Sequence, residues 1–518
     1  MTRTAGEIGA GLEPARDARP ITLGERIHVI GAAGAGASAA ALLAVAAGAE
    51  VSGCDAGGAS PYTPALEAAG IVVLHGHDAA HVEADPRPQR LAVTKALTAI
   101  EPDHPELVAA RAAGIPVEPW QQLIADTAAG RRLVAVAGTH GKSTTSGWLV
   151  HLLVAAGADP SAFVGALLPT ALTGGAPATA RRGDGEAFVV EADEYAGNFD
   201  PYRPEIAVLT NAEWDHPDVF ADLDAVVGAF EGWTRRLPAG ATLVANVADP
   251  GVAEVVERTF RHQAIRIVAV ALANVAPGRS GYQRGITEQF ATRLGPARSL
   301  LGRIAAADAS GTTLEITGLD PTRDPVTVRL ATAGRHNAAN ALAVAGAAVA
   351  LGIDPAAIAA GLASFTGVGR RLERKGEAAG IVVYDDYGHH PTAIRETIAA
   401  IRQREPGRRV WAVYEPLTFH RTAALLGDFA SALATADAVA VADIWAGRDP
   451  DTTIASAAGL ADSVARLRPD VPLAAPGSVE ATADWLAAAV RPGDAVLVMG
   501  GGRSYRIGEL LLEALQSR

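Results

Sequence analysis

The stretch AGTHGKST, which ends at Thr144, contains residue types that can bind a nucleoside triphosphate. Its two glycines allow a tight backbone turn that points N–H groups at an anion. Lys142 can then reach the β- and γ-phosphates, and the Ser143 hydroxyl can bind Mg²⁺ at the start of a following helix. The residues of this predicted phosphate loop are Gly138, Thr139, His140, Gly141, Lys142, Ser143 and Thr144.

The context of the loop supports this interpretation. The hydrophobic run LVAVA before the loop predicts a buried strand, and the residues after the loop predict a helix. The usual pattern G-x-x-x-x-G-K-[ST] would place a glycine where this chain has Val136. The alternative is an ordinary strand–turn–helix connection that merely contains the letters GKS.

Two further predicted strands end in polar residues that could bind a metal ion. The segment VVEADE ends in Glu191, Asp193 and Glu194. The segment after VLTN contains Asp215 and His216. The carboxyl ends of parallel strands share one edge of a sheet, and ligands bind there. Carboxylates suit Mg²⁺ and a histidine can complete a second metal site, so the three motifs together indicate a nucleotide–magnesium site.

Composition and charge restrict the possible classes of protein. The chain has 518 residues, is 49% hydrophobic and carries a net charge of -13, which argues against a general nucleic-acid binder. The apolar run AGASAAALLAVAAGA is too short to span a bilayer. Cys54 is the only cysteine, which excludes an intrachain disulfide and fits a reducing compartment. We therefore expect a cytoplasmic monomer or homodimer that binds neither nucleic acid nor membrane.

The hydrophobic pattern divides the chain into three blocks, 1–130, 131–368 and 369–518. Strand-like and helical segments alternate in each block, which predicts an α/β fold with sheets covered by helices on both faces. We expect a Rossmann-like first domain, a central P-loop ATPase domain with a mostly parallel sheet, and a Rossmann-like third domain. The stretch 270–330 has little periodicity and is interpreted as loop with small β structure.

A second glycine-rich loop, GAAGAGAS, follows the strand-like run RIHVI in the first block. Gly31, Gly34 and Gly36 could form a phosphate-binding turn. Asp55 ends the next predicted strand, where a dinucleotide-binding fold places its ribose-binding acid, so an NAD-dependent dehydrogenase is an alternative for this block. However, Ala33 occupies the middle position of G-x-G-x-x-G, and no hydride-transfer constellation follows.

The motifs GTHGKSTT, EADEY, TNAEWDH, GRHNAANALA, GVGRR and DDYGHHP resemble those of the Mur ligase superfamily, in the same order across nearly the whole chain. The phosphate loop of that family reads G-T-x-G-K-[ST]-T and lacks the first Walker glycine, which accounts for Val136. More narrowly, the chain resembles the branch that adds L-alanine to UDP-N-acetylmuramate. Several other members use a carbamylated lysine shortly after the D-H pair, and residues 217–237 contain no lysine.

The resemblance implies an ATP-dependent carboxylate–amine ligase of peptidoglycan precursor synthesis. Such enzymes convert the carboxylate of UDP-N-acetylmuramate to an acyl phosphate, which an amine, expected here to be L-alanine, attacks to form an amide. Transfer of the γ-phosphoryl group depends mainly on positioning and charge neutralisation. By resemblance, Lys142 holds phosphates, Ser143 and Glu191 hold one Mg²⁺, and His216 holds a second. Lys142, Glu191 and His216 are the expected catalytic residues.

The resemblance also implies the other binding residues. The ATP site would add His336, Asn337, Asn340, Arg371 and Asp385, with Asp386 as the alternative to Asp385. The UDP-substrate site would comprise Gly31, Gly34, Gly36, Asp55 and Thr94. The amine site would comprise Tyr387, His389 and Arg421. Without the resemblance, these side chains would be interpreted as helix caps, linker residues and parts of surface loops.

The motif VYEPLTFHRT departs from the family pattern, which is close to F-Q-P-H-[RT]-[YF]-[ST]-R-T. Leu417 replaces a histidine and Thr418 a possible arginine, whereas Arg421 remains as the expected partner of the amine substrate's carboxylate. Because fewer cations are present here, two alternatives stay open. One is a ligase that attaches a whole tripeptide to UDP-N-acetylmuramate, and the other is a catalytically silent nucleotide-binding relative.

Overall fold

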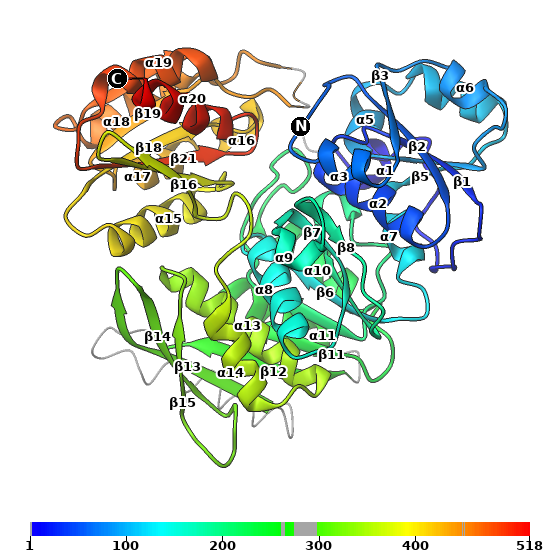
Figure 1. The fold of residues 1–518 in the computed structure, drawn as a ribbon, viewed down its shortest axis with the longest axis horizontal. Coiled ribbons are helices and arrows are strands. Elements are labelled where there is room, and N and C mark those ends of the chain that lie inside the picture. Colours follow the sequence, from blue (N-terminus) through cyan, green and yellow to red (C-terminus); the bar gives the residue numbers. More distant parts are fainter. Residues whose placement is uncertain (1–2, 261–264, 274–297, 448, 450, 518) are drawn as a thin grey trace.

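The computed structural model describes residues 3–260, 265–273, 298–447, 449 and 451–517. Three sheets form three lobes: the first part of the chain, in blue, lies beside the last part, in yellow to red, and both lie above the green middle part (Figure 1). The predicted α/β class with three domains is confirmed. Within these described ranges, no helix is both long and apolar enough to cross a membrane.

The first sheet is parallel throughout, with strand order β3-β2-β1-β4-β5. Its strands are β1 (Arg26–Ile30), β2 (Glu50–Asp55), β3 (Val72–His75), β4 (Arg90–Val93) and β5 (Val117–Pro119). The helices are α1 (Ala5–Ile8), α2 (Ala35–Ala46), α3 (Thr63–Ala68), α4 (Ala80–Glu83), α5 (Lys95–Ile100), α6 (Pro105–Ala112) and α7 (Trp120–Thr127). The chain leaves β1 toward β2 on one side, and β4 lies on the other, so the carboxyl end of β1 is a topological switch point.

The middle sheet has ten strands in the order β15-β14-β13-β12-β11-β10-β6-β9-β7-β8. The strands are β6 (Arg132–Ala137), β7 (Ser161–Leu168), β8 (Ala178–Arg181), β9 (Ala187–Glu191), β10 (Ile206–Leu209), β11 (Thr242–Asn246), β12 (Arg266–Leu272), β13 (Arg298–Asp308), β14 (Gly311–Thr317) and β15 (Val326–Leu330). Its helical segments are α8 (Lys142–Ala155), α9 (Thr170–Thr173), η1 (Tyr195–Gly197), α10 (Leu223–Thr234), α11 (Pro250–Phe260), α13 (Arg335–Leu351) and α14 (Pro355–Ser364).

The region interpreted as loop with small β structure contains more strand than that interpretation allows. β13, β14 and β15 form an antiparallel meander that extends the parallel part of the middle sheet at one edge. The alternating burial along β13 and β14 lets one face pack on the core while the other meets solvent. The glycine- and proline-containing stretch after Ala273 lies outside the described residues.

The third sheet has the order β16-β17-β21-β18-β19-β20, and only the β16 edge is antiparallel. Its strands are β16 (Glu373–Ala378), β17 (Ile381–Asp386), β18 (Arg409–Glu415), β19 (Ala438–Ala442), β20 (Leu473–Gly477) and β21 (Asp494–Gly500). Its helices are α15 (Pro391–Arg404), α16 (Phe419–Ala424), α17 (Leu426–Leu433), α18 (Ala457–Leu467), α19 (Val479–Ala489) and α20 (Tyr505–Gln516).

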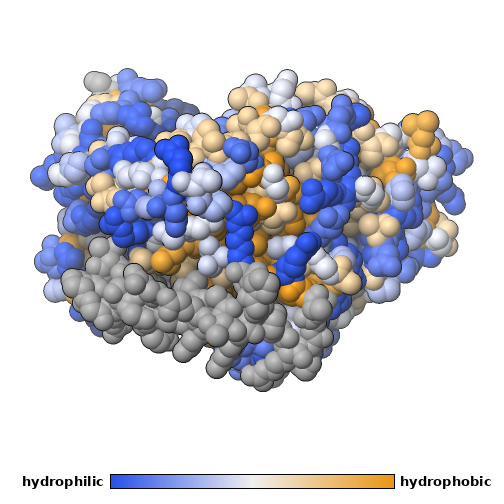
Figure 2. All heavy atoms as spheres, turned by 90° about the horizontal axis from the view of Figure 1, so that it is seen from below, coloured by the Kyte–Doolittle hydropathy of each residue, from blue (hydrophilic) through white to orange (hydrophobic). Residues whose placement is uncertain are grey.

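Small residues explain how the helices lie so close to the sheets. The alanine-rich helix α13 packs on β11 and β12, where a Cβ atom at Gly346 would lie 2.6 Å from Val244 Cγ1. In α15, Ile394, Ile398 and Ile401 are buried on one helix face, as their spacing predicts. From below, hydrophobic side chains gather near the centre of the molecular surface, and hydrophilic ones dominate its left side (Figure 2).

Candidate active site

The carboxyl ends of three neighbouring strands build the centre of the site. β6 lies between β9 and β10, and all three run parallel, so the loops after them meet at one edge of the middle sheet. The phosphate loop follows β6, Glu191 ends β9, and the segment with Asp215 and His216 follows β10. These three segments share one cavity of about 500 Å³, which side chains of the first and third domains also line.

The glycines of the phosphate loop are required by the packing around them. Gly141 is the N-cap of α8 with φ 79°, and a Cβ atom there would lie 2.6 Å from Asn340 Oδ1. The His140 N–H donates to Asn211 Oδ1 (2.7 Å), and Thr210 Oγ1 donates to the His140 carbonyl (2.7 Å). Thr210 and Asn211 were not among the predicted site residues, although their position directly after β10 was a usable signal. They fix the shape of the loop.

Gly138→Ala should weaken nucleotide binding. Gly138 has φ +134°, and a Cβ atom there would lie 2.2 Å from Thr210 Oγ1. Backbone strain of about 1–3 kcal/mol should weaken ATP binding about 5- to 150-fold, measured by calorimetry. Gly157→Ala is the matched control, because Gly157 also has a positive φ (+78°) but no atom within 4 Å of its added Cβ. Equal ATP affinity in the two variants would contradict the assigned loop geometry.

Lys142 occupies the mouth of the loop. Its Nζ donates to the Gly138 carbonyl (2.7 Å) and to Glu194 Oε2 (2.8 Å), and Asp193 Oδ1 lies 3.6 Å away. Burial alone would lower the pKa of Lys142, but the charges of Glu194 and Asp193 outweigh it and raise this pKa. The ammonium group therefore stays charged where phosphates would bind.

Ser143 and Glu191 lie together, as a shared metal ion requires. Ser143 Oγ donates to Glu191 Oε1 (3.0 Å), and Glu191 Oε2 accepts from the Gly165 N–H (2.6 Å). Arg371, from the junction with the third domain, donates to Ser143 Oγ (2.7 Å). Mg²⁺ prefers oxygen ligands, and the hydroxyl and the carboxylate both offer oxygen atoms. The chemistry of this donor pair therefore fits the ion.

A second group of potential ligands comprises Asp193, Glu194 and His216, whose ligand atoms all lie within 4.8 Å of one another. His216 Nε2 is 3.9 Å from Glu194 Oε1. Burial opposes ionisation of Asp193, but the charge of Lys142 outweighs it and lowers the pKa of this carboxyl group. His216 has φ 54°, an uncommon backbone conformation that directs this side chain. Two carboxylates and an imidazole fit a second divalent ion beside the first donor pair.

Three of the predicted ATP-site residues lie in the first turns of helix α13. His336, Asn337 and Asn340 all line the cavity. Asn337 Nδ2 donates to the Ala333 carbonyl (2.8 Å), and His336 Nδ1 lies 3.7 Å from Glu396 on α15. The cavity therefore continues from the phosphate loop toward the junction with the third domain.

Asp385 and Asp386, the alternatives for the predicted ATP site, are placed differently. Asp385 is fully buried and accepts from Arg370 Nε (3.0 Å), and it is not among the described residues that line the cavity. Asp386 does line the cavity, and its carboxylate accepts from the Leu372 and Gly388 N–H groups. Of the two, Asp386 is the one that lines the cavity, and Asp385 pairs with Arg370.

The predicted UDP-substrate residues share the carboxyl edge of the first sheet. Gly31 follows β1, Asp55 ends β2 and Thr94 follows β4. Asp55 accepts from the Ala33 N–H (3.1 Å), so its carboxylate shapes the glycine loop. In the N-terminal turn of α2, Gly36 lines the cavity, where a Cβ atom would lie 2.2 Å from the Trp120 ring. Gly34 is the N-cap residue of this helix.

The predicted amine-site residues line the cavity from the third domain. His389 Nδ1 lies 2.9 Å from the Tyr387 carbonyl, and the Arg371 guanidinium lies 5.0 Å from the Tyr387 ring centroid. Burial, with the nearby charge of Arg421, holds the pKa of His389 well below its ordinary value, so this ring is neutral. One wall of the cavity thus carries the aromatic ring of Tyr387, the neutral imidazole of His389 and the cationic guanidinium of Arg421.

Arg421 has a partner that its sequence context did not reveal. Its Nε donates to Asp215 Oδ1 (2.7 Å), and its Nη2 lies 3.1 Å from His216 Nδ1. Both members of the Arg421–Asp215 pair are buried, with side chains 3% exposed. The pair joins the third domain to the middle domain at the cavity.

Further contacts between these two domains were also missed. Thr392 Oγ1 donates to Glu213 Oε2 (2.7 Å), and the ring centroids of His140 and His390 are 4.4 Å apart. Within the third domain, His420 of the VYEPLTFHRT motif pairs with Asp449 (3.3 Å). Leu417 lines the cavity as an apolar group where the family pattern has histidine.

A phosphate loop on the middle sheet, acidic and imidazole groups at the same edge, and walls from two flanking α/β domains define a P-loop enzyme with a composite site. Comparison with known proteins agrees. The Mur ligase catalytic domain matches residues 26–132, the Mur ligase middle domain 136–348, and the Mur ligase glutamate ligase domain 370–502. The chain belongs to the Mur ligase family.

Relatives with known names cover almost the whole chain. A UDP-N-acetylmuramate–L-alanine ligase from Kineococcus radiotolerans is 40% identical over 95% of this chain and 97% of its own length. The protein of the same name from Mycobacterium sp. strain JLS is 37% identical over 95% and 96%. The fold is similar to the structure of a UDP-N-acetylmuramate–alanine ligase from Thermotoga maritima (TM-score 0.74, 23% identity, 95% and 99% covered). It is also similar to a murein peptide ligase from Psychrobacter arcticus (TM-score 0.69, 25% identity, 96% and 99% covered).

Proposed function

We propose that this chain joins the carboxylate of UDP-N-acetylmuramate to the amine of L-alanine, with ATP as the energy source and Mg²⁺ as cofactor. The observation that carries the proposal is the single cavity in which Lys142, Glu191 and Arg421 meet from the phosphate loop, a strand end and the third domain. The relatives named above support the choice of substrates, because they match over nearly the full chain.

The first step is a phosphoryl transfer. A carboxylate oxygen of the substrate attacks the γ-phosphorus of ATP, the bond to the β–γ bridging oxygen breaks, and ADP leaves. Lys142 and the N–H groups of the loop hold the phosphates. Arg371 approaches the loop from the domain junction, where it donates to Ser143 Oγ. When bound, Mg²⁺ held by Ser143 and Glu191, with a second ion at His216, would neutralise phosphate and carboxylate charge. The chain's task is to position these groups and exclude water.

The second step forms the amide. The amine nitrogen attacks the acyl carbon, the carbon–oxygen bond to phosphate breaks, and inorganic phosphate leaves. The imidazole of His389 is uncharged, so it can hydrogen-bond the incoming amine without repelling its positive charge. The Arg421 guanidinium is the cation available for the carboxylate of the amino acid. Amine binding is therefore assigned to the third domain, opposite the phosphate loop.

A phosphate-release assay tests the choice of amine. Purified protein with ATP, Mg²⁺ and UDP-N-acetylmuramate should release phosphate when L-alanine is added and remain near background without an amine. Glycine, L-serine and the tripeptide should support turnover at least about tenfold more weakly, since one methyl group is worth about 1–3 kcal/mol in a fitted pocket.

Two other outcomes of that assay would replace the proposal. Release that requires the tripeptide and not alanine would indicate a peptide-recycling ligase instead. Binding of ATP and UDP-N-acetylmuramate in calorimetry, without turnover for any amine, would indicate a silent relative. The relatives favour alanine over the tripeptide, and the intact Lys142, Ser143 and Glu191 cluster favours turnover.

A further inference from the structure

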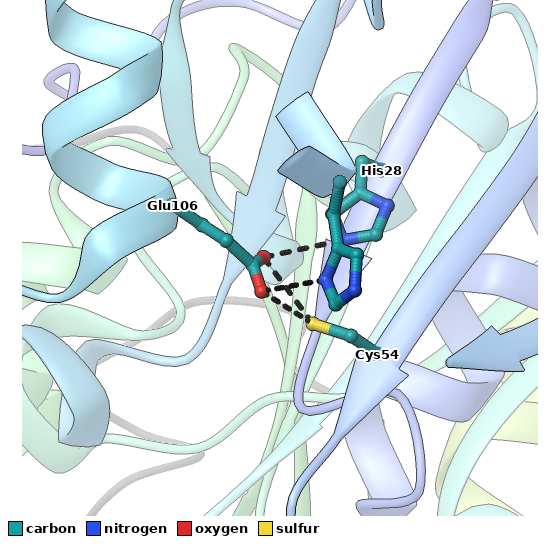
Figure 3. A group of neighbouring side chains, drawn as sticks. His28, Cys54 and Glu106 are labelled. Atoms are coloured by element: carbon teal, nitrogen blue, oxygen red, sulfur yellow. Dashed lines mark hydrogen bonds and ion pairs between the residues drawn. The ribbon is translucent and has the colours of Figure 1, made fainter. Parts of the chain in front are cut away.

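A cluster of potential metal ligands lies inside the first domain. It comprises His28 on β1, Cys54 on β2, His81 on α4 and Glu106 on α6, whose ligand atoms all lie within 4.8 Å of one another. Figure 3 shows His28, Cys54 and Glu106 pointing toward one another from two strands and a helix. All three are fully buried, and none of the four ligands is among the residues that line the active-site cavity. We define these four side chains as the first-domain cluster.

The spacing of the first-domain cluster is close to that of a tetrahedral metal site. Glu106 Oε2 lies 3.2 Å from His28 Nε2, and Glu106 Oε1 lies 3.0 Å from His81 Nδ1. Metal–ligand bonds of about 2.0–2.3 Å place tetrahedral ligands about 3.3–3.8 Å apart, and the four ligand atoms here lie within 4.8 Å of one another, so they need only a small rearrangement to surround one ion. Cys54 Sγ lies almost equally far from both Glu106 oxygens (3.1 and 3.2 Å). A single thiol proton cannot point at both oxygens.

Polar atoms in and beside the cluster lack hydrogen bonds. His28 Nδ1 pairs with Ser52 Oγ (2.8 Å), and its fully buried Nε2 faces Glu106 Oε2 at an ion-pair distance of 3.2 Å without the geometry of a hydrogen bond. Neither ring nitrogen of His104, the N-cap residue of α6, makes one, although this residue is only 2% exposed. Buried polar atoms that make no hydrogen bond are costly and rare. A histidine that is oriented by a hydrogen bond at one ring nitrogen and directs the other at the cluster, as His28 does, has the usual arrangement of a metal ligand.

We propose that His28, Cys54, His81 and Glu106 bind one Zn²⁺ ion in a closed, four-coordinate structural site. Two imidazoles, a thiolate and a carboxylate match the borderline-soft character of Zn²⁺, whereas Mg²⁺ and Ca²⁺ prefer oxygen donors throughout. Four protein ligands leave no position for a substrate, which distinguishes the site from a catalytic zinc. Binding releases the Cys54 thiol proton to solvent.

At this position the ion would hold several elements of the first domain together. It would connect β1 and β2 to α4 and α6. β1 leads directly into Gly31 of the glycine loop, and β2 ends at Asp55, which accepts from the Ala33 N–H of that loop. The side chain of His81 is 14% exposed, so the ion can enter there. Zinc should therefore stiffen the loop of the first domain without taking part in phosphoryl transfer.

Metal content of the full-length protein tests the proposal. Protein stripped with a chelator and dialysed against Zn²⁺ should retain one zinc per chain by mass spectrometry and melt at a higher temperature than the stripped protein. Loading with Co²⁺ should produce a thiolate-to-cobalt charge-transfer absorption. Because Cys54 is the only cysteine, this band separates the first-domain cluster from any metal held at the ATP site.

Variants sharpen the test. His81→Ala removes a half-buried ligand near the surface and should weaken Zn²⁺ binding by at least about 100-fold. Ser52→Ala should weaken it about 10- to 100-fold through the orientation of His28. Cys54→Ala should abolish the cobalt band. His75→Ala is the matched control, since His75 is exposed at the end of β3 and should leave zinc retention unchanged.

Two results would overturn the proposal. One is wild-type protein that keeps no more zinc than a buffer blank and gives no cobalt–thiolate band, an outcome that depends on no variant. The other is a folded His81→Ala protein, checked by circular dichroism, that retains Zn²⁺ as tightly as the wild type.

Discussion

Lys142→Ala should reduce kcat for phosphate release by at least about 100-fold, the effect of losing one preorganised charge in a phosphoryl-transfer site. The ammonium group lies between the Gly138 carbonyl and Glu194, in the space the phosphates would enter. Its positive charge is maintained there by Glu194 and Asp193. Without the ammonium group, the negative charges of Glu194 and Asp193 would lie beside the transferred phosphoryl group with no lysine to balance them. Steady-state kinetics with saturating ATP, UDP-N-acetylmuramate and L-alanine would measure the loss.

Two controls separate the chemical role of Lys142 from a structural one. Lys375→Ala removes a lysine of the third domain that pairs with Glu373 near the surface (3.2 Å), and it should leave kcat within about twofold. Lys142→Arg keeps the positive charge but replaces the compact ammonium by a planar guanidinium, so its kcat should lie between those of Lys142→Ala and the wild type. Near-normal kcat in folded Lys142→Ala protein would refute the phosphate-loop assignment.

Arg421→Ala should lower kcat/KM for the amine at least about 30-fold, as expected when one partner of a buried charge pair is removed at about 2 kcal/mol or more. Two causes add. The site loses the cation assigned to the amine's carboxylate, and Asp215 is left buried without its partner. Burial opposes ionisation of Asp215, and the charge of Arg421 is what holds its pKa well below the ordinary value. The third domain should therefore also separate from the middle domain, which small-angle scattering would detect as a larger radius of gyration.

A double variant distinguishes these two causes. Asp215→Asn combined with Arg421→Ala removes the uncompensated charge, so the compact shape should return while amine affinity stays low. Arg402→Ala is the matched control in the same domain, because Arg402 pairs with Asp437 at the surface and should matter little. If the double variant regained normal KM for the amine, Arg421 would be a domain contact and not a substrate ligand.

The sequence alone determined the features that depend on local order. The phosphate loop was predictable because strand, glycine turn, lysine and helix are contiguous, and the structure has β6, the loop and α8 in that order. The approach of Glu191 to Ser143 was also predictable, since parallel strands end at one edge of a sheet. Both inferences need only the strand periodicity and a general rule of α/β folds.

The meander of β13, β14 and β15 was not recognised as part of the middle sheet. Its strands pair antiparallel at an edge, and β13 and β14 alternate buried and exposed residues, which gives a weaker hydrophobic signal than a fully buried parallel strand. Which strand β13 pairs with also depends on which edge of the middle sheet is free, and that is decided only when the fold has assembled.

Only the tertiary structure decided which charged groups meet across long stretches of chain. Arg421 and Asp215 are separated by 206 positions, and Lys142 and Glu194 by 52. The first-domain cluster likewise draws Cys54 and Glu106 together from 52 positions apart. No local pattern fixes such pairs, because their energy depends on burial and on distance in space, and both exist only after the sheets have packed.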